Sequence, residues 1–327
     1  MFRVAIIGCG GIAQVHAAVL NNLPETELIA CADIRPERAG AMAEKYGCRA
    51  YASMDALLDA ETPDAVHLCT PHYLHAPMAK AAADRGIAVF SEKPPVISRE
   101  QWALLEDAAA KVPFGVCFQN RYNPNVEEAK RLIREGVYGR LLGGRAFVTW
   151  KREIPYYRDS GWRGAWATEG GGVLINQSIH TLDLLVQLFG APDRAETHMV
   201  NHHLKGAIEV EDTVEAYLIL GGCPVLFYAT TAYTTDAPVM IELHLEKAVL
   251  RLESDALEIR TGDGTERRTF EVEAALGKGY WGTGHPACIA DFYASVAEKR
   301  PFRNNLASVK DTADLMLTMY EQGRAGL

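Results

Sequence analysis

The chain has 327 residues, of which 48% are hydrophobic and 23% are charged, and this balance excludes a disordered or collagen-like protein. Its 33 basic and 42 acidic residues give a net charge of −9, which disfavours nucleic acid and anionic membranes as partners. No apolar run approaches the roughly 20 residues of a membrane-spanning helix, and the length predicts about two domains.

The N-terminal segment and the cysteines both favour a cytoplasmic protein. An apolar run follows Arg3, as in a signal peptide, but glycines interrupt it at once and no cleavage region follows, so we expect a first strand. The seven cysteines are scattered and odd in number, whereas a disulfide framework is denser and usually even. We therefore expect reduced thiols and a cytoplasmic location.

Residues 1–120 alternate short β-branched runs with helix-forming segments. The expected strands are Arg3–Ile7, Glu27–Asp33, Ala65–Cys69, Ala88–Glu92 and Phe114–Phe118. The expected helices include Ile12–Asn21, Pro36–Tyr46 and Ala76–Arg85. This alternation predicts βαβ units and a parallel sheet, and the near-continuous apolar strands indicate that both faces of the sheet are covered.

Residues 121–327 have a different pattern, typical of an α+β domain. The expected helices are Asn125–Glu135, an apolar helix at Gly172–Phe189, and two closing helices at Pro286–Lys299 and Ser308–Glu321. Between Ala195 and Glu273 apolar and polar residues alternate with period two, which predicts an antiparallel sheet with two unlike faces. The sequence therefore predicts a first domain at 1–120 and a second at 121–327.

The first motif, Gly8-Cys9-Gly10-Gly11-Ile12-Ala13, has the form G-x-G-x-x-A between an expected strand and an expected helix. Glycines there permit a tight turn and a close approach of pyrophosphate to the helix N-terminus. Asp33 ends the next strand, where a carboxylate accepts hydrogen bonds from the adenosine ribose. Together they predict a dinucleotide site that prefers NAD, while the nearby Arg35 leaves NADP open. The alternative is an ordinary turn with a helix-capping aspartate.

Two further motifs follow the ends of the third and fourth expected strands, the edge at which parallel sheets bind ligands. Cys69-Thr70-Pro71-His72-Tyr73-Leu74-His75 resembles metal-ligand spacing, but no fourth ligand is evident, so we expect cofactor contact and no metal. In Ser91-Glu92-Lys93-Pro94, the proline holds the backbone of the preceding lysine extended. Lys93 would then point from a rigid strand end toward the ligand crevice. Such a lysine can stabilise developing negative charge on a substrate oxygen. Without the other motifs, we would interpret Lys93 as a surface lysine before a proline turn.

The fourth motif is a triple glycine, residues 170–172, that opens the expected apolar helix. Asn176, His180, Asp183 and Gln187 form one polar stripe on that helix, whereas its other stripes are apolar. A helix this apolar is largely buried, so the polar stripe needs partners or a cavity. We interpret His180 as a catalytic acid/base, with a hydrogen-bonded core histidine as the alternative.

Taken in this order, the motifs resemble the Gfo/Idh/MocA oxidoreductases, the family of glucose–fructose oxidoreductase and inositol dehydrogenase. The resemblance rests on Gly8–Ala13, Glu92-Lys93-Pro94 and the glycine-rich helix with Asn176 and His180, and it covers nearly the whole chain. It implies an α/β fold with an N-terminal Rossmann domain and a C-terminal α+β domain with a large, open-faced, mostly antiparallel sheet. It also implies a homodimer or homotetramer formed through that sheet, and a last helix that packs back on the first domain.

The resemblance also assigns roles to single residues. Lys93 matches the catalytic lysine of the family and His180 its histidine acid/base. Asn176 stands where many members have aspartate, and because an amide takes up no proton, we expect it to position the substrate hydroxyl. Asp183 is the candidate to orient the His180 imidazole.

Aromatic and basic residues around Trp162 resemble the nucleotide-sugar and sugar 3-dehydrogenase branch, with packing between domains as the alternative for the tryptophans. The residues expected to bind the cofactor are Gly8, Gly10, Gly11, Ile12, Asp33, Ile34, Arg35, Cys69, Thr70, Pro71, His72, His75, Glu92, Lys93, Gln119, Trp162 and Arg163. Those expected to bind substrate are Lys93, Arg121, Tyr122, Tyr156, Arg163, Asn176 and His180.

These observations predict an NAD(P)-dependent oxidoreductase that transfers a hydride between nicotinamide and a secondary hydroxyl of a sugar, nucleotide sugar or cyclic polyol. Two alternatives remain open. One is a redox-neutral, NAD-dependent glycosidase or lyase, which would release a leaving group without net NADH. The other is a non-catalytic NAD(H) sensor, which would bind the cofactor and turn nothing over.

Overall fold

The computed structural model describes residues 1–270 and 282–324. The chain divides into two compact units: Met1–Gln119 with Ala275–Val309, and Asn120–Ala274 with Lys310–Leu327. This division differs from the expected domains 1–120 and 121–327, because a C-terminal segment groups with the first unit. None of the helices in the described part of the chain combines the length and apolar character needed to cross a bilayer.

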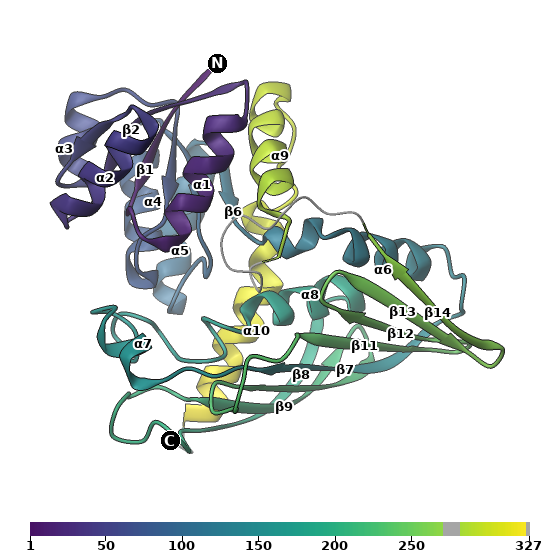
Figure 1. Ribbon diagram of the computed structural model, residues 1–327. Helices are drawn as coiled ribbons and strands as arrows, with labels where there is room; N and C mark the ends of the chain where they lie inside the picture. The colour runs from purple at the N-terminus through teal and green to yellow at the C-terminus, as the bar shows by residue number, and fades with distance from the viewer. Residues whose placement is uncertain (271–281, 325–327) are drawn as a thin grey trace. The chain divides into compact units, whose positions relative to one another are not determined.

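The first unit is built on a six-stranded parallel sheet of order β3-β2-β1-β4-β5-β6 (Figure 1). Its strands are β1 (Phe2–Ile7), β2 (Thr26–Ala32), β3 (Arg49–Tyr51), β4 (Ala65–Leu68), β5 (Ala88–Ser91) and β6 (Phe114–Val116). This doubly wound order reverses direction between β1 and β4. The predicted parallel sheet is thus confirmed, and β3 is an additional strand that the sequence patterns did not predict.

Helices connect these strands and cover the sheet. They are α1 (Gly11–Asn22), α2 (Pro36–Tyr46), α3 (Met54–Ala60), α4 (His75–Ala83) and α5 (Arg99–Lys111), with the short 3-10 turns η1 (His72–Leu74) and η2 (Gln119–Tyr122). The late helix α9 (His285–Glu298) packs against α1. Its Phe292 ring packs at a tilt against Phe90 of β5, with 5.1 Å between ring centroids, so a segment far along the chain completes the core of this unit.

The second unit contains an eight-stranded sheet of order β14-β13-β12-β11-β7-β10-β9-β8, antiparallel except for the β7–β10 pair. The strands are β7 (Leu141–Thr149), β8 (Pro192–Val200), β9 (Thr213–Leu220), β10 (Cys223–Thr230), β11 (Met240–Leu245), β12 (Val249–Glu253), β13 (Ala256–Thr261) and β14 (Gly264–Thr269). The predicted mostly antiparallel sheet is therefore confirmed.

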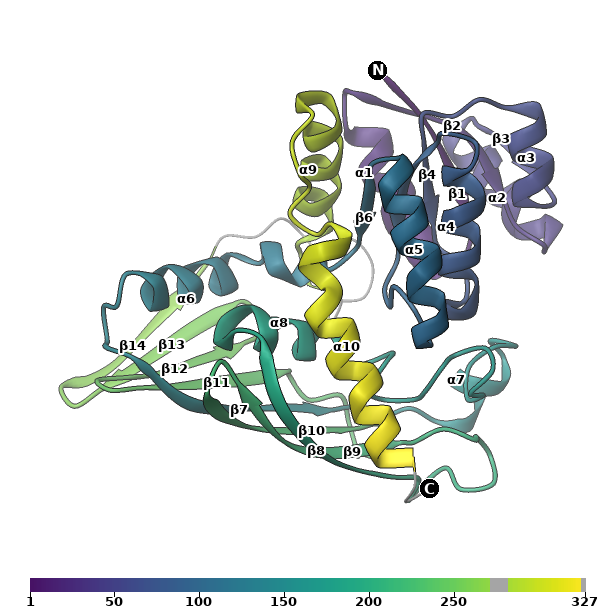
Figure 2. The ribbon, with the colours of Figure 1, turned by 180° about the vertical axis from the view of Figure 1, so that it is seen from behind.

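Helices α6 (Pro124–Arg134) and α8 (Ile179–Phe189) pack on one face of this sheet (Figure 2). The short helix α7 is Ile154–Arg158, and the last helix, α10, is Leu306–Gly323. From Lys310 onward α10 belongs to the second unit, where Tyr320 hydrogen-bonds Glu211. The expectation that the last helix packs back on the first domain stays a prediction; the first four residues of α10 group with the first unit and the rest with the second.

The expected apolar helix Gly172–Phe189 is wrong in its first seven residues. Residues 172–178 form turns, and α8 begins only at Ile179. Asn176 N and Gln177 N bond the carbonyls four residues back, but Ser178 N bonds the Val173 carbonyl five residues back, which breaks the helical pattern before α8. The Glu211 carboxylate accepts hydrogen bonds from the N–H groups of Gly172 and Leu174, and the Tyr320 hydroxyl accepts one from Ile175, so tertiary contacts hold this turn. The polar stripe of a continuous helix is therefore interrupted between Asn176 and His180.

Candidate active site

The glycine motif forms a tight turn between β1 and α1. Gly8 has φ +87°, and a Cβ there would lie 2.7 Å from the Cys69 carbonyl oxygen, so both its conformation and its surroundings require glycine. Gly10 precedes the first residue of α1, Gly11, and a Cβ on it would meet no described atom within 4 Å. The turn is therefore packed at Gly8 and open at Gly10, as a helix N-terminus that receives a pyrophosphate must be.

Asp33 lies beside this turn at the end of β2. Its Oδ2 accepts a hydrogen bond from Cys9 N at 2.7 Å, and its Oδ1 accepts one from Arg35 N at 2.8 Å. Each carboxylate oxygen keeps a second lone pair for a ribose hydroxyl. Ile34 is 87% exposed at the same edge, so the three residues expected around the adenosine lie together.

The loop after β4 lies against the same turn. The Thr70 Oγ1 atom is buried without a hydrogen-bond partner among the described residues, which is the kind of group that a bound ligand satisfies. His75 has its Nδ1 2.8 Å from Pro94 O and its Nε2 2.9 Å from Thr70 O. It thus joins this loop to the one that follows Lys93. Together with the open space at Gly10, these groups fit a dinucleotide.

The candidate lysine follows a buried network that the sequence motifs did not indicate. Lys93 is half-buried and Glu92 is 5% exposed at the end of β5. The Glu92 Oε1 atom lies 2.9 Å from His16 Nε2, His16 Nδ1 lies 2.8 Å from His67 Nδ1, and His67 Nε2 lies 2.8 Å from the Tyr293 hydroxyl. The network connects α1, β4, β5 and α9. No local pattern joins residues so far apart in sequence.

The pKa shifts of His16 and His67 indicate which ring nitrogens in this network carry protons. Burial tends to lower the pKa of His16, but the neighbouring Cys69, Cys117 and Glu92 side chains together raise it well above its ordinary value. Burial and the His16 charge lower the pKa of His67. His16 is then an imidazolium that donates to Glu92 and to His67 Nδ1, and neutral His67 donates from Nε2 to Tyr293. Lys93 therefore leaves the sheet next to a fixed, charge-balanced ion pair.

Metal-like geometry occurs in the same place rather than in the Cys69–His75 motif. Among the described residues, His16, Glu92 and Cys117 form the group whose ligand atoms lie within 4.8 Å of one another. Because His16 and Glu92 already form an ion pair, a cation would have to displace that contact. This group therefore gives no support for a metal site, and the absence of a metal stays a prediction.

In the second unit, Asn176 and His180 are distinguished by their accessibility. They are the two residues of 171–186 that are not buried. Asn176 lies in the turn before α8, and His180 is the second residue of that helix. The two side chains that the resemblance places in the chemistry are thus the accessible positions of an otherwise buried segment.

A cluster of polar and aromatic side chains surrounds Asn176. Its Nδ2 atom donates to Glu169 Oε1 at 2.5 Å and to the Tyr156 hydroxyl at 3.4 Å, and Gln177 Nε2 donates to the same hydroxyl at 3.0 Å. The Arg163 guanidinium lies 4.4 Å from the centroid of the Tyr156 ring and 4.6 Å from that of Trp162. Residues 156, 162, 163 and 176 were all expected in the site, and the structure brings Tyr156, Arg163 and Asn176 together.

Arg121 and Asp183 form a buried ion pair. Arg121, 1% exposed, donates from Nε to Asp183 Oδ2 at 2.7 Å and from Nη2 to Oδ1 at 2.5 Å. The Thr312 hydroxyl also donates to Asp183 Oδ1, at 2.8 Å. Asp183 therefore binds Arg121 and α10, which speaks against its orienting His180 and favours a structural role for Arg121.

The remaining expected residues are placed as follows. Gly11 is exposed, Ile12 and Pro71 are half-exposed, and His72 and Gln119 are buried; Arg35 caps α2, and Tyr122 and Trp162 are half-exposed. Lys93 and the glycine turn belong to the first unit, whereas Tyr156, Trp162, Arg163, Asn176 and His180 belong to the second. The cofactor contacts of Trp162 and Arg163 stay predictions. The sequence patterns missed His16 and Glu211, whose partners lie outside any short motif. Glu169 stands directly before the triple glycine, but no role was predicted for it.

Family models and known proteins match this architecture. Residues 2–117 match the Gfo/Idh/MocA oxidoreductase family model with an NAD-binding Rossmann fold, and residues 126–251 match a C-terminal domain model of the same family. The chain is 34% identical to the D-glucoside 3-dehydrogenase of Escherichia coli over 197 residues, which cover 58% of this chain and only 54% of that protein.

Two matches extend further. The chain is 28% identical to the inositol 2-dehydrogenase of Rhizobium meliloti over 276 residues, 81% of this chain and 80% of that protein. The WlbA dehydrogenase of Bordetella pertussis, solved with NADH and UDP-GlcNAcA, superposes with a TM-score of 0.86 at 26% identity, covering 100% of this chain and 97% of that one. The glycine turn, the Glu92-Lys93-Pro94 segment and the two matched domain models together place this chain in the Gfo/Idh/MocA family of NAD-binding oxidoreductases.

Proposed function

We propose that the protein is an NAD(P)-dependent dehydrogenase that oxidises a secondary hydroxyl of a sugar, nucleotide sugar or cyclic polyol. The observation that carries this proposal is the accessible His180 and Asn176 in an otherwise buried segment of the second unit, in a chain whose first unit has an open glycine turn. The relatives named above act on glucosides and inositol, and WlbA was solved with a nucleotide sugar. NAD is the expected cofactor, because the Asp33 carboxylate would repel a 2′-phosphate.

In the proposed reaction, each candidate residue of this chain has a separate role. The bound nicotinamide supplies the hydride acceptor. His180 takes the proton of the substrate hydroxyl, and the Lys93 ammonium donates a hydrogen bond to the same oxygen and stabilises its negative charge. Asn176 positions the hydroxyl, and the aromatic rings of Tyr156 and Trp162 offer flat surfaces to a sugar ring. Arg163 can bind a phosphate or carboxylate on the substrate.

The direct test follows reduction of the nicotinamide by absorbance. Purified protein would receive NAD or NADP with a panel of glycosides, inositols and nucleotide sugars. We expect turnover with at least one class, and a loss of about 10²- to 10⁴-fold in kcat/KM in both Lys93→Ala and His180→Ala. Lys247→Ala and His198→Ala, two exposed positions, are the matched controls and should keep full activity.

Other outcomes would redirect the proposal. Full activity in His180→Ala would contradict the acid/base assignment. Tight NADH binding without turnover on the whole panel would contradict the dehydrogenase. In that case, release of a leaving group without net NADH would identify the redox-neutral hydrolase or lyase.

We further propose a homo-oligomer formed through the large sheet of the second unit. Its uncovered face carries apolar side chains: Leu142 is 49% exposed, Leu226 is 55% exposed and Tyr217 is 41% exposed. Leu226 pairs with Tyr217 across β10 and β9, so these side chains are neighbours. Exposed apolar side chains gathered on one sheet, flanked by charged residues such as Arg145, are typical of a protein interface. The location we propose is the cytoplasm, because all seven cysteines are unpaired.

A further inference from the structure

Glu169 is a fully buried carboxylate that the proposed mechanism does not use. Its exposed fraction is 0%, and it precedes the triple glycine. Oε2 accepts a hydrogen bond from Gly164 N at 2.5 Å, and Oε1 accepts one from Asn176 Nδ2 at 2.5 Å. Burying a carboxylate costs free energy unless hydrogen bonds or ion pairs compensate the loss of hydration. The direct contact of Glu169 with the half-exposed site residue Asn176 therefore needs an explanation.

The contact selects one of the two orientations of the Asn176 amide. An amide nitrogen only donates and an amide oxygen only accepts, so an ionised carboxylate can face Nδ2 but repels Oδ1. The Tyr156 hydroxyl, 3.4 Å away, contacts the same nitrogen. With Nδ2 held in this way, Oδ1 is the end that Asn176 can offer to another donor.

We propose that Glu169 is a positioning residue that holds the Asn176 amide with Oδ1 as an acceptor for the substrate hydroxyl. This inference rests on the proposed function, in which Asn176 contacts that hydroxyl. Protonation of Glu169 releases the constraint, because a carboxylic acid O–H can donate to Oδ1 and both amide orientations then become possible. The charge on Glu169 thereby determines whether Asn176 presents an acceptor to the substrate.

The surroundings place this change of charge near neutral pH. Burial raises the pKa of Glu169 to about 7, opposed by its hydrogen bonds with Gly164 and Asn176 and by the Arg163 charge. The titratable groups that face it are Arg163, Tyr156 and Tyr157 around α7, Glu211 after β8, and Tyr320 on α10. Glu169 is ionised above this pKa and protonated below it, so substrate binding should weaken as the pH falls through about 7.

The first test is a double-mutant cycle on the steady-state parameters of the intact enzyme. At a pH above the pKa of Glu169, Glu169→Gln should raise KM about tenfold, with kcat and NADH affinity nearly unchanged, because a hydrogen bond to a charged group is lost. In an Asn176→Ala background the same substitution should change KM by less than about twofold. An equal rise in KM in both backgrounds would overturn the proposal, since it would show a role unrelated to Asn176.

The second test does not depend on turnover. The side-chain amide resonance of Asn176, assigned by its disappearance in Asn176→Ala, should shift with a midpoint near pH 7 in the wild-type protein. In Glu169→Gln this shift should be absent. A wild-type resonance that does not change between about pH 6 and 8 would overturn the proposal even if Glu169→Gln does not fold. Should no sugar be oxidised, the proposed function fails, while this resonance still decides the role of Glu169.

Discussion

At the scale of single residues, Glu211 determines the shape of the segment that carries Asn176. Its carboxylate accepts from Gly172 N at 2.9 Å, Leu174 N at 3.0 Å and the Tyr320 hydroxyl at 2.9 Å, with 0% of the residue exposed. Glu211→Ala would leave three buried donors without an acceptor, so we expect a loss of about 3 kcal/mol in the free energy of unfolding. Urea denaturation measures this loss, with the exposed Glu215→Ala as control. An unchanged urea midpoint would contradict this assignment.

The same carboxylate should make stability depend on pH. Burial raises the pKa of Glu211 to about 7, above its ordinary value of 4.5. A folded-state pKa above the unfolded one contributes stability that is fully present below pH 4.5 and is lost as the pH rises through about 7. We expect the free energy of unfolding to fall between about pH 5 and 8, and to fall less in Glu211→Gln. An equally steep fall in that variant would assign the titration to other groups.

Short sequence motifs indicated the accessible candidates Lys93 and His180, but not the buried residues that support their surroundings. Lys93 and His180 lie in short motifs whose chemistry is local, so their residue types and spacing were informative. The supporting residues His16 and Glu211 are recognised only by partners 76 and 39 positions away, Glu92 and Gly172. The contact between Asp183 and Arg121, 62 positions apart, could not be predicted for the same reason.

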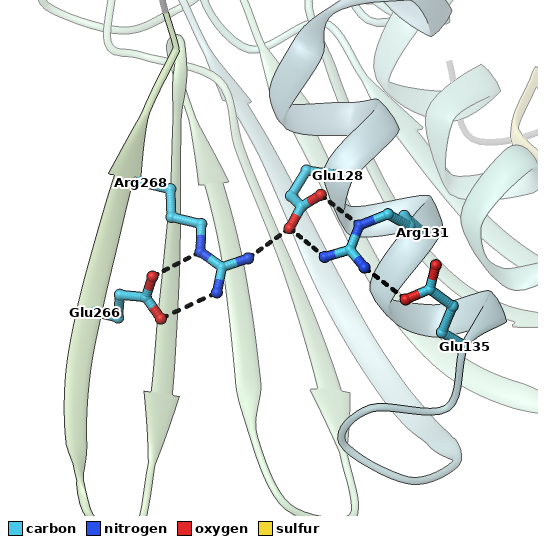
Figure 3. A network of polar contacts seen from close by, with 5 residues as sticks. All are labelled: Glu128, Arg131, Glu135, Glu266 and Arg268. Atoms are coloured by element: carbon cyan, nitrogen blue, oxygen red, sulfur yellow. Dashed lines mark hydrogen bonds and ion pairs between the residues drawn. The ribbon is translucent and has the colours of Figure 1, made fainter.

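At the scale of elements, the edge strand β14 is joined to α6 by a chain of ion pairs (Figure 3). Arg268 contacts both Glu266 and Glu128, and Arg131 lies 2.8 Å from Glu128 and 2.5 Å from Glu135. Nearly all other β14 side chains are exposed, so this network is the main side-chain anchor of the strand among the described contacts. Its groups are partly exposed, which limits the coupling of each pair to at most about 1 kcal/mol.

We therefore expect Arg268→Ala to affect β14 locally. The amide protons of β14 should exchange faster by up to about fivefold, and the effect should shrink in high salt, because screening already weakens these pairs. Hydrogen exchange measured by mass spectrometry tests this expectation, with the neighbouring, exposed Arg267→Ala as matched control. Equal acceleration in both variants would show that the ion pairs do not hold the strand.

Secondary structure was predictable where the pattern was long. The five expected parallel strands and the alternating strands of the second unit were confirmed, because burial on one or both faces fixes their pattern. The three-residue strand β3 is too short to carry a periodic signal. Residues 172–178 are apolar enough for a helix, but Ser178 N bonds the Val173 carbonyl five residues back, and the regular helix begins only at Ile179.

At the scale of the whole molecule, the uncovered sheet face should set the oligomeric state. Leu226→Arg replaces an exposed apolar side chain by a charge, next to Tyr217 on β9 and beside the existing charge of Arg145 on β7. We expect this variant to shift the mass measured by light scattering towards that of a monomer, because burying an unpaired charge is costly. Val137→Arg, at a 46% exposed position outside the sheet, is the control. A monomeric wild-type protein would contradict the proposed interface.

The path of the chain through its two units limits how it can be divided. The chain leaves the first unit after Gln119, returns at Ala275 and leaves again after Val309. A fragment ending at Gln119 would contain the whole parallel sheet but not α9, so Phe90 would lose Phe292 and His67 would lose the Tyr293 hydroxyl. A stable NAD-binding fragment would therefore need α9 spliced onto β6. Truncation or domain exchange at residue 120, the boundary predicted from the sequence, would yield a fragment whose hydrophobic core is incomplete.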